Sequence, residues 1–75
     1  MKDLKKFHET AAKHFEKAAE HHRSAAQHAA DGDHELAAQH AHVAHGHALQ
    51  AHEQAALAVK KNVALHDQRE EEEVE

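Results

Sequence analysis

Apolar and histidine residues recur every seven positions through the first part of the chain, and charged residues fill the opposite positions. Three neighbouring rows are Leu4, Ala11, Ala18 and Ala25; Phe7, His14, His21 and His28; and His8, Phe15, His22 and Ala29. A seven-residue repeat of this kind places its rows side by side on one helical face. No Pro or Gly interrupts the segment, so the pattern predicts a helix over about residues 2–30.

The same period returns from His34 to about Arg69 and predicts a second helix. Its polar row is narrow, and most of the remaining circumference is apolar or histidine. The polar row consists of Gln39, Gly46, Glu53, Lys60 and Asp67, and one apolar row consists of Ala37, Ala44, Ala51, Ala58 and Leu65. A helix that is apolar around so much of its surface needs more than one packing partner.

Asp31-Gly32-Asp33 is the only turn signal between these segments. Gly32 suits the left-handed residue that ends a helix, and Asp33 suits the N-cap of the next helix. A short link between two long helices predicts an all-α antiparallel helical hairpin, with residues 1–69 forming one domain. Ala-rich helices bury little area, so we expect the hairpin to pair with a second copy as a homodimeric four-helix bundle.

The acidic segment 70–75 places carboxylates at a helix C-terminus, the unfavourable end of the helix dipole, and is expected to be a disordered tail. No apolar run approaches the roughly 18 residues needed to cross a membrane. The start of the chain lacks the pattern of a signal segment, which makes the cytoplasm the expected location.

The chain holds 12 His among 75 residues, no Cys, and a formal net charge of −5 with His neutral. Imidazole titrates near neutral pH, so this charge changes sharply in the physiological range. Basic residues are few and scattered and aromatic residues are scarce, which argues against a nucleic-acid partner. Neutral imidazole is also a common ligand of copper and zinc ions.

Folding the hairpin about Gly32 predicts which histidines meet. The expected neighbours are His14 with His52, His21 with His45, and His22 with His42, while His28 falls within about a turn of His34 and His40. The predicted metal ligands are His14, His21, His22, His28, His42, His45 and His52. His40 and His47 adjoin the polar row and are weaker candidates, and His8, His34 and His66 are left unassigned.

Each of these histidines can also be read as an ordinary hydrogen-bonded core residue. Leaving a buried polar group unpaired costs about 1–3 kcal/mol, and few core acceptors are present for so many rings. Copper or zinc ions would satisfy several rings at once. The sequence lacks HExxH, GxxxxGK and GxSxG motifs, and its Glu residues lie mainly on outer faces, so no enzyme activity is expected.

At the level of architecture the chain resembles the bacterial copper storage proteins, and also small uncharacterised bacterial His-rich helical proteins. The resemblance rests on the spacing of His14, His21, His28, His42, His45 and His52. It implies a four-helix bundle whose core stores metal. The departure is in ligand type, because the copper storage proteins use Cys for Cu(I) and this chain has none.

Two functions follow as hypotheses. One is sequestration or buffering of copper or zinc by histidine layers in a bundle core. The alternative is a structural or pH-sensing oligomeric bundle, in which protonation of core histidines dissociates the assembly.

Overall fold

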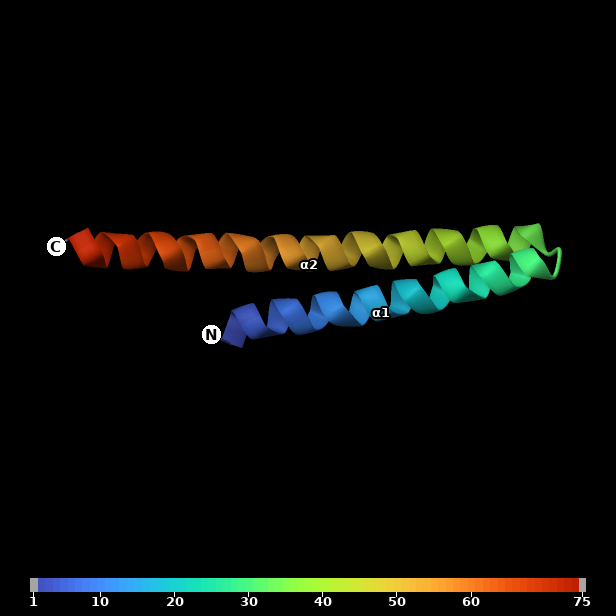
Figure 1. The fold of residues 1–75 in the computed structure, drawn as a ribbon, viewed down its shortest axis with the longest axis horizontal. Helices are drawn as coiled ribbons and strands as arrows, with labels where there is room; N and C mark the ends of the chain where they lie inside the picture. Colours follow the sequence, from blue (N-terminus) through green and yellow to red (C-terminus); the bar gives the residue numbers. More distant parts are fainter. Residues whose placement is uncertain (1, 75) are drawn as a thin grey trace.

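The chain folds as a helical hairpin, in a computed structural model that describes the backbone of residues 2–74 and the side chains of residues 3–65 and 67. Helix α1 spans Lys2–Ala30 and helix α2 spans His34–Val74 (Figure 1). The two helices run side by side in opposite directions. The predicted all-α antiparallel hairpin is confirmed, and so are the starts of both helices.

The turn forms as its residues require. Gly32 has φ +82°, the left-handed conformation that costs a glycine least. The Asp33 amide donates to the His28 carbonyl (2.8 Å) and the Gly32 amide donates to the Ala29 carbonyl (3.1 Å). This pair of bonds is a Schellman cap, which satisfies the last carbonyls of α1. Asp33 then caps α2, because its Oδ1 accepts from the Leu36 amide at 3.1 Å.

A row of alanines forms the contact between the helices. Ala44, Ala51 and Ala58 of α2 have no exposed surface, and Ala11 and Ala18 of α1 are 6% exposed. They belong to the seven-residue rows recognised in the sequence. Because methyl side chains let two backbones come close, the helices pack along a narrow line, and bulkier side chains lie at its edges.

Helix α2 is longer than its partner and runs past the start of α1 (Figure 1). The molecule is a rod of 66 × 15 × 13 Å. Helix α2 continues to Val74, past the end near Arg69 that the sequence predicts. Glu is a good helix former, so the unfavourable dipole interaction does not end the helix there. Glu75 lies outside the described residues.

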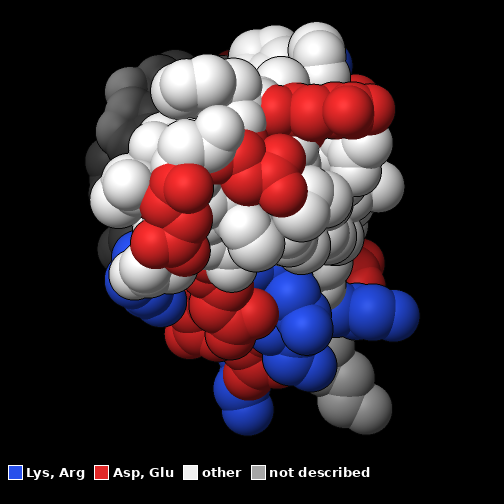
Figure 2. All heavy atoms as spheres, turned by 90° about the vertical axis from the view of Figure 1, so that its right-hand side faces the viewer, with Lys and Arg blue, Asp and Glu red and all other residues white. Residues whose placement is uncertain are grey.

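Charge is distributed unevenly around the rod. Acidic side chains gather at the turn end, with Lys and Arg side chains beyond them on the α1 side (Figure 2). Between Leu36 and His52, α2 carries no Asp, Glu, Lys or Arg. In the part of the chain that the structure describes, neither helix combines the length and apolar character of a membrane span.

Candidate functional site

Five histidines line one edge of the alanine contact and alternate between the two helices. Their order along the rod is His14, His47, His21, His40, His28, and all five are partly buried. Successive ring centroids lie 5.3, 5.7, 5.2 and 5.3 Å apart. We call this row the imidazole seam.

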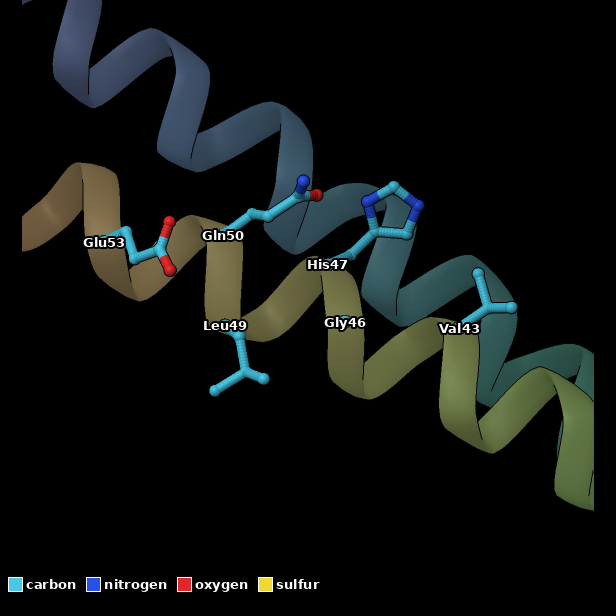
Figure 3. Close-up of a pocket in the computed structure, with 6 residues that line it drawn as sticks. All are labelled: Val43, Gly46, His47, Leu49, Gln50 and Glu53. Atoms are coloured by element: carbon cyan, nitrogen blue, oxygen red, sulfur yellow. The ribbon is translucent and has the colours of Figure 1, made fainter.

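The alternation follows from the seven-residue spacing on both helices. His14, His21 and His28 are successive members of one row of α1, and His40 and His47 are successive members of one row of α2. Antiparallel packing runs the two rows past each other, so that each α2 ring falls between two α1 rings. The ring of His47 points from α2 towards α1, whereas neighbouring Leu49 points away (Figure 3).

Two pairs of rings approach within hydrogen-bond distance. The Nδ1 atoms of His14 and His47 are 3.1 Å apart, and those of His21 and His40 are 3.0 Å apart. Because Nδ1 of a neutral ring either donates or accepts, each pair needs one ring protonated at Nδ1 and the other protonated at Nε2. Each pair therefore holds a single proton between its two Nδ1 atoms.

The ring separations fix the direction of these bonds. A five-membered ring with bonds of about 1.33 Å has its atoms about 1.1 Å from its centre. If both nitrogens lie on the line between the ring centres, the centroid distance equals the Nδ1···Nδ1 distance plus one radius for each ring. This largest possible centroid distance is about 5.3 Å. The observed distances are 5.3 and 5.2 Å. The nitrogens thus lie nearly on the line joining the two rings, and the lone pair of one ring faces the N–H of the other.

The other two neighbours in the seam pack as nearly parallel rings. His21 and His47 differ by 12° in orientation, and His28 and His40 differ by 10°. The seam is therefore two in-line hydrogen-bonded pairs, held in register by parallel ring contacts between and beside them.

Solvent reaches the seam from the side of Gly46. A surface hollow of about 460 Å³ lies over this residue, bounded by Val43, His47, Leu49, Gln50 and Glu53 (Figure 3). A Cβ at Gly46 would meet no other atom within 4 Å. His47 is the seam residue that borders this hollow.

The structure divides the predicted ligands into two groups. His14, His21 and His28 lie in the seam, while His22, His42, His45 and His52 are exposed. The expected proximity of His28 and His40 is confirmed, since their rings stack. The expected partners of His14 and His21 are wrong: His14 meets His47 and His21 meets His40, each five residues earlier in α2 than predicted.

The rings of His52 and Phe15 instead pack nearly at right angles, with centroids 5.4 Å apart and an interplanar angle of 86°. His40 and His47, the weaker candidates because they adjoin the polar row of α2, lie in the seam. Their seven-residue spacing, which matches that of His14, His21 and His28, was the signal that identifies them. His8 and His34 are exposed, and the side chain of His66 lies outside the described residues.

No group of three or more His, Asp or Glu side chains converges on one point within the described residues. Comparison with models of protein families, with curated proteins and with solved structures finds no match.

Proposed function

We propose that this protein sequesters or buffers copper or zinc ions through the imidazole seam and catalyses no reaction. The observation that carries the proposal is the pairing of ring nitrogens from opposite helices, with Nδ1 atoms 3.0 and 3.1 Å apart. Two imidazole nitrogens directed at one point make half of a tetrahedral site for zinc, or part of a copper site.

A two-nitrogen site suits storage and exchange. Structural zinc sites are closed by four protein ligands, whereas positions left open accept water or an incoming ligand. The seam rings are only partly buried, so ions can enter and leave without unfolding the hairpin. Because each pair takes one ring from each helix, a bound ion also ties α1 to α2 and couples metal binding to folding.

We further propose that a second copy covers the side of the hairpin opposite the seam. We call it the open face: Phe15, Leu49 and Val59 are 43%, 51% and 59% exposed there. Phe15 contacts His52, and Leu49 and Val59 lie on the α2 rows that also carry His42, His45 and His52. A homodimeric four-helix bundle would bury these side chains, and would bring His22, His42, His45 and His52 near their copies as additional ligands.

The alternative, a pH-responsive assembly, draws support from the same pairs. A second proton would place two N–H groups against each other across a gap of 3.0 or 3.1 Å. Protonation of both rings therefore opposes the packing of the helices, and acid would loosen the hairpin without any metal.

A thermal melt with and without metal tests the proposal. The test variant is His40→Gln/His47→Gln, which removes the α2 ring of each pair. The control is His8→Gln/His34→Gln, which removes one exposed ring from each helix. An ion present at about 100 times its Kd stabilises a folded protein by about 2.7 kcal/mol, which raises the Tm by more than about 10 °C for a chain of this size.

We expect copper or zinc to raise the Tm of the wild type and the control at pH 7.5 and to leave the seam variant nearly unchanged. Far-ultraviolet circular dichroism before heating shows whether all three proteins are folded. Equal shifts in the three proteins would place the ions elsewhere. The absence of any shift, together with loss of helix between pH 7.5 and 5 in metal-free protein, would favour the pH-responsive alternative.

A further inference from the structure

The in-line geometry of the two histidine pairs carries a more specific inference about the ion. We propose that each pair, His14 with His47 and His21 with His40, binds one Cu(I) ion in linear two-coordinate geometry through its Nδ1 atoms. This inference rests on the proposed metal-binding function and adds the oxidation state, the donor atoms and a capacity of two seam ions per chain.

Direction, more than distance, separates linear from bent coordination. With metal–nitrogen bonds of about 2 Å, square-planar and tetrahedral sites need the two nitrogens about 2.8 and 3.3 Å apart. A linear site needs them about 4 Å apart, so the present contacts of 3.0 and 3.1 Å must open by about 1 Å. A bent site fits the distance, but both lone pairs would have to swing away from the line that now joins them.

Swinging the rings disrupts the rest of the seam. His47 lies parallel to His21, and His40 lies parallel to His28, within 12° and 10°. Turning each ring by about 35–45° towards a shared bent site breaks both contacts. A linear ion sits on the existing line between the nitrogens, so the rings only need to move apart and can keep their planes. Monovalent d10 ions such as Cu(I) accept two-coordination, whereas Zn(II) prefers four ligands.

The proton balance of this exchange is defined. In a neutral pair, one ring carries its proton on Nδ1 and the other on Nε2. Cu(I) forms bonds to both Nδ1 atoms, and the displaced proton moves through water to the free Nε2 of the same ring. The neutral pair therefore releases no proton to the buffer, while a pair that already holds an extra proton releases one. The ion arrives as Cu(I), so no electron is transferred.

The two sites are separate. His14 and His21 are one heptad apart on α1, as are His47 and His40 on α2. Seven residues of helix span about 10.5 Å, too far for one ion to be shared between the pairs. Loss of one pair should therefore leave the other able to bind, and the sites should fill independently.

Silver provides a redox-inert probe of the same geometry, because Ag(I) is also a monovalent d10 ion and its nuclei split a directly bonded ¹⁵N resonance. We would titrate ¹⁵N-histidine-labelled protein with Ag(I) at pH 7.5 and follow the ring nitrogens by nuclear magnetic resonance. The expected result is splitting at the Nδ1 resonances of four histidines, complete at two ions per chain. His47→Gln should lose one ion and His40→Gln/His47→Gln should lose both, while His8→Gln/His34→Gln keeps both.

X-ray absorption of the anaerobic Cu(I) protein gives an independent reading. We expect the intense pre-edge feature of two-coordinate Cu(I) and a first shell of two nitrogens. Splitting at Nε2, unchanged capacity in the seam variant, or a three- or four-nitrogen shell would overturn the linear assignment. If Zn(II) raises the Tm through the seam and neither Ag(I) nor Cu(I) binds there, this inference fails and the proposed function stands. If none of these ions binds the seam, both fail.

Discussion

The hydrogen bond between His21 and His40 should reverse its contribution to stability between neutral and acidic pH. A double-mutant cycle with His21→Ala, His40→Ala and the double variant isolates the interaction between the two rings. At pH 8, the hydrogen bond of 3.0 Å between these partly buried rings should contribute about 1 kcal/mol. Metal must be removed with a chelator so that the coupling energies at the two pH values differ only through protonation.

If acid adds a proton to each ring of the pair, both rings become cations. With centroids 5.2 Å apart, their repulsion is about 0.8 kcal/mol at the dielectric constant of water and about 3 kcal/mol at an effective value of 20. Solvent reaches both rings, so we expect a value towards the lower end. The coupling energy should change from about 1 kcal/mol favourable to about 1 kcal/mol unfavourable.

The assay is urea unfolding of the four proteins at each pH, at one protein concentration, because self-association would shift apparent stability. The contact of Phe15 with His52 supplies the control cycle, since only one of its rings can become charged. Its coupling should not become repulsive at pH 4.5. A His21–His40 coupling that stays favourable at pH 4.5, or is negligible at pH 8, would refute the assignment of an in-line proton-sharing pair.

Three further changes test the fold and the assembly. Ala51 is fully buried, so Ala51→Leu should destabilise the hairpin by about 1–3 kcal/mol in urea unfolding, whereas Ala56→Leu at an exposed position should have little effect. Asp33→Ala removes the acceptor of the Leu36 amide and should lower the free energy of unfolding by about 1 kcal/mol, which restoration by Asp33→Asn would check. Leu49→Lys places a charge on the open face and should weaken self-association in sedimentation equilibrium; an unchanged mass would show that a second copy does not cover this face.

The elements of the fold could be predicted from the sequence because their signals are local. Gly32 takes the only left-handed conformation in the described chain, and Asp33 caps α2 as its side chain requires. The alanine row formed by Ala44, Ala51 and Ala58 was visible as a seven-residue repeat, and it is the most buried part of α2. The end of α2 was less predictable, because an acidic run disfavours a helix C-terminus without supplying a residue that stops it.

The partners of individual histidines could not be predicted in the same way. A turn at Gly32 fixes the antiparallel direction of the helices, but it does not fix the rotation of each helix about its own axis. The rotation of α2 determines whether His45 or His40 is the partner of His21. The rotation of α2 also decides which of its flanks faces α1. In the structure the flank beside the polar row faces α1, and its histidines, His40 and His47, complete the seam.

The most direct test of the central claim is the number of copper ions that the seam retains. Equilibrium dialysis against buffered Cu(I) under anaerobic conditions, followed by elemental analysis, counts ions per chain in the wild type, in His40→Gln/His47→Gln and in His8→Gln/His34→Gln. The account predicts that the seam variant holds two fewer ions than the wild type and that the control holds the same number. Equal copper content in all three folded proteins would contradict it.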